Sequence, residues 1–366
     1  MVKQITARAY YDAPSDEAVD SFYNGMRRHW QPVLPAAELA RGELKSVELL
    51  EEKILLTRLD GKLVALQDLC RHFQARLSNG EIREIENSGQ CVSCRYHGWA
   101  YDASGQCVEI PQLVEGRDIP QSAQVPTYLV QEKYGLIWVC LEPEPKFDLP
   151  DFPEFEDPTF QVGPLRTYEP WAAAAPRVLM GTLDDTHFPW VHEGILGDRS
   201  HAQAPDHKVW REDRYLRVEF TTSQPKNAIV EEDGKSGERP FVQDVDYSYH
   251  VGMPNVLRLV TIHRPFQAQD EARVYVIWLA TCPRKYNETD SFWRLARNFD
   301  VDPARDRVYE EFEDAVRAQD RPMVESQRPW LLPPFWTKIE LPLRPADLPL
   351  LEYQKWLEEL GIATAV

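Results

Sequence analysis

Two short arms that contain cysteine and histidine constrain what this chain can fold into more than any other feature of its sequence. Cys70 and His72 form a Cys-x-His arm, and after 21 intervening residues Cys94 and His97 form a Cys-x-x-His arm. Thiolates and imidazoles are side chains that bind transition metals. If each arm lies in a turn between two strands, the arms together present two thiolates and two imidazoles to one metal site.

Two kinds of metal site use this set of ligands. A tetrahedral zinc ion accepts two cysteines and two histidines, but zinc fingers usually carry both cysteines in one arm and both histidines in the other. Here each arm supplies one of each. A Rieske [2Fe-2S] cluster needs a thiolate pair on one iron and an imidazole pair on the other. We therefore predict that a Rieske cluster is bound by Cys70, His72, Cys94 and His97.

The other cysteines are expected to be structural. Cys91 forms a Cys-x-x-Cys pair with Cys94, but using it in place of Cys94 would leave His97 without the thiolate of its own arm. Six cysteines in 366 residues are also too few and too unevenly spaced for the disulfide framework of a secreted protein. The remaining cysteines stand in apolar or strand-like contexts and are expected to be buried: Cys107, Cys140 and Cys282.

A second group of metal-binding side chains lies in residues 179–198. His187 and His192 are five residues apart, and Asp184 stands three residues before His187. On an ideal helix Asp184 and His187 would lie about 60° apart on one face, whereas the two histidines would lie about 140° apart. We therefore expect a helical segment over 176–194 in which Pro189 supplies the irregularity that lets the histidines converge.

Two histidines need a carboxylate to complete the facial triad of an Fe(II) oxygenase, and the candidate lies in a long helix expected over 303–327. Apolar residues recur along that helix at four-residue spacing: Val308, Phe312, Val316 and Val324. Asp320 fills the gap in this ridge, where a carboxylate is costly unless it meets a cation. We predict that Asp320 joins the two histidines at iron. The alternative is an ion pair of Asp320 with Arg317 or Arg321, with both histidines as hydrogen-bonded core residues.

The pattern of strands and turns predicts two domains, as the length of the chain also does. Residues 47–110 read as short strands joined by tight turns, including a hairpin turn at Asp60 and Gly61. Residues 134–141 read as a further buried strand, and the stretch 142–158, which is rich in proline and acid, is typical of a linker.

Beyond this linker the pattern changes to helices mixed with longer strands, such as those expected at 215–222 and 272–280. We therefore predict an α+β chain with three parts: an N-terminal extension at 1–26, a small all-β domain at 27–144 and a larger domain at 145–366.

Charge and hydropathy limit the partners of the chain. A formal net charge of −18 disfavours nucleic acid as a partner, because an acidic surface repels phosphate. No window approaches the roughly 20 apolar residues that a membrane span needs, and residues 1–13 lack the apolar run of a signal sequence. We expect a soluble, cytoplasmic protein that binds neither nucleic acid nor membrane.

With its motifs in this order, the chain resembles the Rieske non-haem iron oxygenases over about residues 30–361. The resemblance rests on the two arms, on LDDTHFPWVHEGILGD around the histidine pair, and on QDRPMVESQRP, which has Asp320 in the ligand position. The tail LEYQKWLEELG is similar to that of the monooxygenase and demethylase branch. Two positions depart from the family pattern: Arg95 stands where proline is common, and Gly181 where asparagine is often found.

The resemblance implies a Rieske domain followed by a helix-grip, START-like catalytic domain with an antiparallel sheet. It also implies a head-to-tail homotrimer in which the cluster of one subunit serves the iron of its neighbour, with Asp184 as the electron relay between subunits. The implied cofactors are the [2Fe-2S] cluster and a mononuclear Fe(II), and O2 is the co-substrate. NAD(P)H would supply electrons through a separate reductase or ferredoxin, since the chain has no GxGxxG motif of its own.

The expected activity is hydroxylation of a C–H bond in a small aromatic, heterocyclic or alkaloid-like substrate. The alternatives are oxidative O- or N-demethylation, ring cis-dihydroxylation, and electron transfer by a Rieske protein without a second metal. We expect substrate-binding residues in the strands between residues 201 and 282, and the candidates are Tyr249, Met253, His263 and Trp278.

Overall fold

The computed structural model describes residues 13–229, 243–264 and 271–362, which form two compact units. The smaller unit comprises residues 27–146. The larger unit comprises residues 147–366 together with the chain up to Met26. Part of the predicted N-terminal extension, residues 1–12, lies outside the described residues.

The smaller unit contains two antiparallel sheets and is all-β apart from short 3-10 turns at Ala36–Glu38 and Leu77–Asn79. The six-stranded sheet has the order β1-β10-β9-β4-β3-β2. Its strands are β1 (Gln31–Pro35), β2 (Lys45–Leu49), β3 (Glu52–Leu59), β4 (Lys62–Gln67), β9 (Thr127–Lys133) and β10 (Leu136–Cys140). The four-stranded sheet contains β5 (Glu81–Ile85), β6 (Gly89–Ser93), β7 (Ala100–Tyr101) and β8 (Cys107–Glu109).

The predicted hairpin is confirmed between β3 and β4, where Asp60 and Gly61 have φ angles of 48° and 78°. Two consecutive positive φ angles define the turn type that matches the twist of a two-residue hairpin. The predicted strand at 134–141 is also confirmed, because β10 is buried along its whole length.

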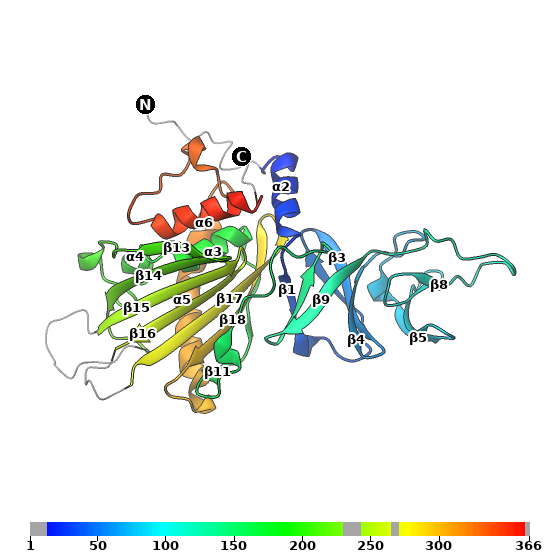
Figure 1. Cartoon of the computed structure of the whole chain (residues 1–366), viewed down its shortest axis with the longest axis horizontal. Helices are drawn as coiled ribbons and strands as arrows, with labels where there is room; N and C mark the ends of the chain where they lie inside the picture. Colours follow the sequence, from blue (N-terminus) through cyan, green and yellow to red (C-terminus); the bar gives the residue numbers. More distant parts are fainter. Residues whose placement is uncertain (1–12, 230–242, 265–270, 363–366) are drawn as a thin grey trace. The chain divides into compact units, whose positions relative to one another are not determined.

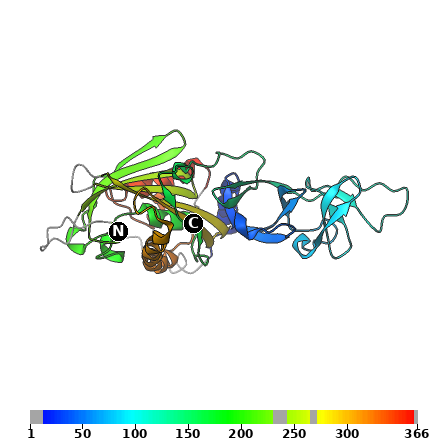
Figure 2. The same ribbon diagram turned by 90° about the horizontal axis from the view of Figure 1, so that it is seen from below.

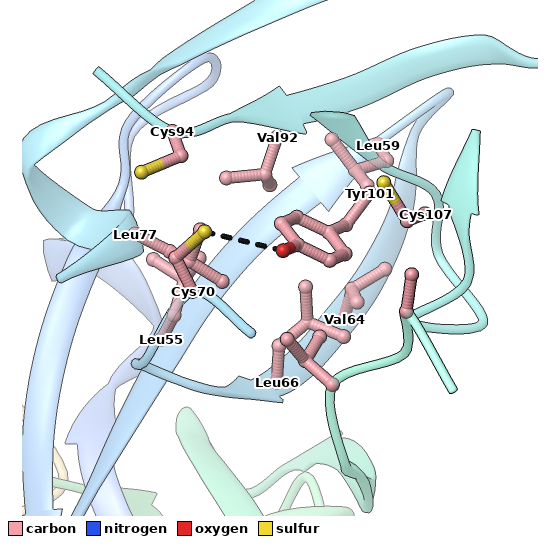
Figure 3. Packing of buried hydrophobic residues seen from close by; sticks show 12 residues of the cluster. Leu55, Leu59, Val64, Leu66, Cys70, Leu77, Val92, Cys94, Tyr101 and Cys107 are labelled. Atoms are coloured by element: carbon pink, nitrogen blue, oxygen red, sulfur yellow. Dashed lines mark hydrogen bonds between the residues drawn. The ribbon is translucent and has the colours of Figure 1, made fainter. Parts of the chain in front are cut away.

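The core of the smaller unit lies between its two sheets. Apolar residues of β3 and β4, such as Leu55 and Leu66, pack against Val92 and Tyr101 of the four-stranded sheet (Figure 3). Cys70 and Cys94 belong to this same buried cluster. The core of the unit therefore holds both cysteines that were predicted as ligands.

The larger unit is built on one long antiparallel sheet with the order β11-β18-β17-β16-β15-β14-β13, in which β12 also pairs with β18. The helices lie around this sheet, and α5 runs along one of its faces (Figures 1 and 2). The strands are β11 (Gln161–Val162), β12 (Arg166–Thr167), β13 (Lys208–Glu212), β14 (Tyr215–Gln224), β15 (Gln243–Met253), β16 (Val256–His263), β17 (Arg273–Lys285) and β18 (Glu288–Arg297).

The helices of the larger unit are α2 (Asp16–Met26), α3 (Ala175–Leu183), α4 (Phe188–Val191), α5 (Asp306–Ser326) and α6 (Leu348–Glu359). Short 3-10 turns occur at Pro153–Phe155, Arg199–His201, Pro303–Arg305 and Phe335–Thr337. Helix α2 packs closely on the end of the chain, because a Cβ at Gly25 would lie 2.7 Å from the carbonyl oxygen of Gly361. No helix among the described residues is long and apolar enough to cross a membrane.

The predicted long helix is confirmed as α5, but its predicted apolar ridge is wrong at one end. Val308 is 37% exposed, whereas Tyr309, Val316 and Val324 are buried. A spacing of four residues rotates by about 40° per step on a helix of 3.6 residues per turn. Val308 therefore lies about 160° from Val324 around the axis, while Tyr309 returns to the buried face.

Candidate metal centres

The two arms of the smaller unit fold into the same kind of loop. In the first arm the Cys70 N–H donates to the Ala75 carbonyl at 2.8 Å, and the Gln74 N–H donates to the Cys70 carbonyl at 2.9 Å. In the second arm Cys94 is bonded in the same way, with Trp99 and Gly98 as its partners, both at 2.8 Å. Gln74 and Gly98 occupy equivalent positions, each with positive φ. The two arms thus present their side chains in matched fashion.

The four predicted cluster ligands lie together at the ends of these loops. The Cys70 and Cys94 side chains are buried, at 1% and 2% exposure. The Nδ1 atoms of His72 and His97 lie 3.2 Å apart, and both histidines are half-buried. Trp99 stacks on the His72 ring with a centroid distance of 4.6 Å. Thiols on the inside and imidazoles on the outside form the donor set of a Rieske cluster.

The environment of the thiols favours a bound cation. Burial raises the pKa of the Cys70 thiol, and its hydrogen bond with the neighbouring Cys94 thiol raises it further. The Tyr101 hydroxyl lies 3.1 Å from Cys70 Sγ and accepts the Arg71 N–H at 3.0 Å (Figure 3). Two adjacent buried thiolates require positive charge between them. The residues therefore fit a cluster.

Cys91 and Cys107 lie apart from this ligand set. The Cys91 sulfur faces backbone carbonyls of its own hairpin, at 3.6 Å from Gly89 and 3.9 Å from Ser88. Cys107 lies on the far side of the Tyr101 ring from Cys70 (Figure 3).

In the larger unit, the segment around the second group of ligands is not one helix, so the predicted helix over 176–194 is wrong. Helix α3 ends at Leu183, and Asp184 is extended, with φ −78° and ψ 135°. Asp184 Oδ1 accepts the Thr186 N–H at 2.9 Å and its hydroxyl at 2.8 Å. Such local side-chain bonds compete with the helix.

Contrary to our prediction, Pro189 does not interrupt a helix. It stands in the first turn of α4, whose N-cap is His187. Proline suits that position because a first-turn N–H has no partner within the helix. Asp184 still reaches His187, with Oδ2 accepting the Nδ1 proton at 2.9 Å, but it does so across a turn and not along a helical face.

The three predicted iron ligands converge on one point. The Nε2 atoms of His187 and His192 lie 3.1 Å apart. Asp320 Oδ1 lies 3.4 Å from the first of them and 2.9 Å from the second. The ligand atoms of all three residues lie within 4.8 Å of one another. Helix α5 thus brings a carboxylate to a histidine pair that precedes it by more than 120 residues.

A hydrogen bond at Nδ1, the ring nitrogen that faces away from the triad, fixes the tautomer of each histidine. His187 Nδ1 faces Asp184, and His192 Nδ1 lies 2.8 Å from Gln319 Oε1. Carboxylate and amide oxygens only accept, so each Nδ1 carries a proton and each Nε2 is the nitrogen left to bind a metal ion or a second proton. Two lone pairs and a carboxylate oxygen at this spacing repel one another unless a metal ion or a proton lies between them. This donor set fits a divalent metal, and the outer hydrogen bonds are those that metal-binding histidines usually make.

The alternative partners of Asp320 are engaged elsewhere. Arg317 donates to the Ser291 hydroxyl at 2.8 Å and stacks on Trp293, with its guanidinium 3.7 Å from the ring centroid. Arg321 pairs with Glu325 at 2.9 Å. The sequence-based alternative of an ion pair between Asp320 and one of these arginines is therefore wrong.

Two features of this site were missed in the sequence. Gln319 holds His192 from a position 127 residues further along the chain, and its only sequence signal is that it precedes Asp320. Asp185 accepts from His207 Nε2 at 2.7 Å, in a pair whose side chains are almost wholly buried. This pair anchors the turn between α3 and α4 to the segment that precedes β13.

The triad opens into a cavity between the sheet and α5. The cavity encloses about 610 Å³ of space that protein atoms do not fill, part of it open to solvent. Its walls are mainly aromatic and aliphatic, and its lining residues include Phe188, Tyr247, Leu259, Ile277, Phe312 and Val316. His187, His192 and Asp320 themselves line it.

Of the four residues predicted to bind substrate, Tyr249 and His263 line this cavity, whereas Met253 and Trp278 are not among its lining residues. Successive side chains of a strand alternate between faces. Ile277 faces the cavity, so the next residue, Trp278, faces the other side, where it stacks on Phe152 with a centroid distance of 5.5 Å.

The chain matches two protein-family models, one within each unit. Residues 29–129 match the Rieske [2Fe-2S] domain, and residues 171–362 match the vanillate O-demethylase oxygenase C-terminal domain. The chain is 30% identical over 343 residues to methylxanthine N1-demethylase NdmA of Pseudomonas putida, covering 92% of this chain and 89% of the relative. The chain belongs to the Rieske non-haem iron oxygenases. It is therefore an oxidoreductase whose cofactors are a [2Fe-2S] cluster and non-haem iron.

Further relatives support this membership. Methylxanthine N3-demethylase NdmB of Pseudomonas putida is 30% identical over 348 residues, covering 92% of this chain and 90% of the relative. The solved structure of NdmA with caffeine has a TM-score of 0.76 at 28% identity and covers 93% of this chain and 92% of that chain. The predicted family and α+β fold class are thus confirmed. The match to an oxygenase domain also argues against a Rieske protein that only carries electrons.

Removing the Tyr101 hydroxyl should lower the reduction potential of the cluster. A hydrogen bond to a sulfur ligand stabilises the reduced, more electron-rich state. A net worth of about 0.5–1.5 kcal/mol for one hydrogen bond corresponds to a fall of roughly 20–65 mV for one electron. We expect this fall in a redox titration of Tyr101→Phe. Tyr96 is an exposed tyrosine of the second arm, so Tyr96→Phe is the control. An equal shift of the potential in both variants would contradict the assignment of Tyr101 as a hydrogen-bond partner of the cluster.

Metal binding at the triad should depend on pH. Burial lowers the pKa of His187, but its hydrogen bonds with Asp184 and Asp320 outweigh burial and raise the pKa to about 9. Below that pH a proton competes with the metal for Nε2. We expect the affinity for Fe(II) to rise by up to about tenfold per pH unit from pH 6.5 to 9 and then to level off.

This dependence can be measured by titrating cluster-loaded protein with Fe(II) against a chelator whose own protonation is corrected for. In Asp184→Asn the His187 pKa should fall, so the plateau should begin at lower pH. An affinity that does not change over this range would contradict the prediction.

Proposed function

We propose that this chain removes a methyl group from the nitrogen of a small heterocycle by hydroxylating a C–H bond of that methyl group with O2. The observation that carries the proposal is that His187, His192 and Asp320 line a cavity whose walls are mainly aromatic and aliphatic. A site of this kind brings a flat apolar substrate to the metal. The relatives that match over 92% of the chain bear the names of methylxanthine N-demethylases, which favours demethylation among the reactions expected from the sequence.

Hydroxylation and demethylation share one chemical step. O2, two electrons and two protons convert the N–CH3 group into N–CH2OH and water. The carbinolamine then loses its hydroxyl proton to the nitrogen as the C–N bond breaks, which gives the N–H compound and formaldehyde. When bound, the cluster supplies electrons singly and the iron activates O2.

The residues of the chain are assigned as follows in this proposal. The thiolates of Cys70 and Cys94 hold one iron of the cluster, and His72 and His97 hold the other. His187, His192 and Asp320 hold the mononuclear iron. Asp184 and Gln319 fix the orientation and tautomer of the two histidines, and Asp184 is also the electron relay between subunits.

As an oxygenase component of this family, the chain works with a separate reductase or ferredoxin and a small-molecule substrate. We propose in addition that it assembles as a head-to-tail homotrimer. Phe73 and Tyr96, which flank the cluster histidines, are exposed by 67% and 65%. Asp184 lines a groove of the larger unit beside Leu341, which is 81% exposed. The two exposed aromatic side chains beside the cluster histidines of one subunit suit contact with this groove, whose lining is part apolar and part charged, in the next subunit.

We further propose that the domain boundary lies near residue 145, as the sequence predicts, and that the protein is cytoplasmic. The two matched families lie on either side of that boundary, which supports its position.

The proposed reaction can be tested by supplying NADH, a surrogate reductase and a panel of N-methylated heterocycles that includes caffeine. We expect formaldehyde in an amount equal to a product that has lost one methylene. Asp184→Asn retains the three iron ligands and should lower turnover by about 10-fold to 100-fold, with caffeine binding unchanged. A stable product with one added oxygen, or with two, would contradict demethylation.

A further inference from the structure

One carboxyl group in the cavity wall takes no part in metal binding. Glu313 of α5 lines the cavity and is 5% exposed. Its Oε1 accepts the Tyr275 hydroxyl at 2.9 Å, and no described residue hydrogen-bonds to its second oxygen. No Lys, Arg or His among the described residues forms an ion pair with it within 4 Å. A buried carboxyl with an open acceptor position is costly unless something else occupies that position.

A second polar group faces the same space. Tyr249 of β15 lines the cavity with its side chain fully buried, and its hydroxyl has no hydrogen-bond partner among the described residues. An unsatisfied buried hydroxyl costs about 1–3 kcal/mol. Unsatisfied polar groups such as these, set in a mainly apolar cavity, are typical of a site that orients a ligand.

The charge of the cavity limits what the ligand can be. The described lining residues include no lysine or arginine, and their acidic members are Glu313 and Asp320. Among the lining residues an arene carboxylate or sulfonate would meet no lysine or arginine, and it would lie near the carboxylates of Glu313 and of Asp320, which already offsets part of the charge of the iron. An uncharged ring with polar edges meets no such penalty.

Resting on the proposed function, we propose that Glu313 is the polar anchor that selects the substrate of this enzyme. The selected class is an uncharged nitrogen heterocycle, held through a ring N–H or carbonyl, in preference to arene carboxylates and sulfonates. Burial raises the pKa of Glu313 to about 7, although the hydrogen bond with Tyr275 opposes this rise. Near neutral pH the group can therefore either donate to a carbonyl or accept from an N–H.

The position of Glu313 on α5 also orients the ligand. Glu313 and Asp320 are seven residues apart, which is two helical turns and roughly 10 Å along the axis. Both residues therefore line the same cavity from one helix face. A ring anchored at Glu313 turns its opposite edge toward the triad, so the methyl group that is oxidised lies across the ring from the anchored atom.

The anchor can be tested by equilibrium binding to the cluster- and iron-loaded protein without a reductant, so that nothing turns over. The probes are caffeine, theobromine, toluene-4-sulfonate and 3-chlorobenzoate, and the readout is the dissociation constant from calorimetry. We expect the wild type to bind at least one of the two xanthines about tenfold or more tightly than either anion.

Two substitutions separate the hydrogen bond from the charge. Glu313→Leu should weaken xanthine binding about tenfold or more and tighten anion binding, so that the preference disappears. Glu313→Gln keeps a donor and an acceptor and should retain xanthine binding while admitting the anions. Glu311→Gln, an exposed position on the same helix, is the matched control and should leave all four constants unchanged.

The proposal is overturned if Glu313→Leu keeps the wild-type ratio of xanthine to anion binding, if the wild type prefers the anions, or if it binds neither xanthine. These outcomes do not depend on catalysis. Selective binding without formaldehyde release would refute the proposed demethylation and leave the anchor intact. Formaldehyde release with an unchanged ratio in Glu313→Leu would refute the anchor alone.

Discussion

The structure of the catalytic unit depends on one electrostatic constraint, which is the approach of two imidazole lone pairs to each other beside a carboxylate oxygen. His187 Nε2 and His192 Nε2 are 3.1 Å apart, with Asp320 Oδ1 within 3.4 Å of both. Asp184 and Gln319 bind the opposite nitrogens and prevent either ring from turning its N–H inward. The protein thus holds a set of acceptors that a metal ion stabilises in competition with a proton on His187, and the iron chemistry of the family follows from that arrangement.

The fold supplies this arrangement from three distant segments. The break between α3 and α4 places the rings of His187 and His192 next to each other, and the buried Asp185–His207 pair anchors that break. Helix α5 brings Asp320 and, two turns earlier, Glu313 to the same cavity. One helix therefore carries both a metal ligand and the proposed substrate anchor. A change in its register against the sheet would displace the two functions together.

Much of this site is predictable from the sequence, because its ligands stand in short motifs whose spacing depends on local geometry. The two arms, the histidine pair and Asp320 are of this kind. Gln319, the Asp185–His207 pair and Glu313 depend on tertiary contacts that no short spacing records. The errors have physical reasons too: a four-residue ridge drifts around a helix, which displaced Val308, and strand alternation turned Trp278 to the opposite face of the sheet.

The central claim is that one polypeptide holds a sulfur-bridged iron pair and a separate mononuclear iron. The most direct measurement is the iron and acid-labile sulfide content of the reconstituted protein and of Asp320→Ala. The account predicts about three irons and two sulfides per wild-type chain, and about two of each in the variant, with the spectrum of the cluster unchanged. Three irons retained in Asp320→Ala, or zinc in place of iron in the wild type, would contradict it.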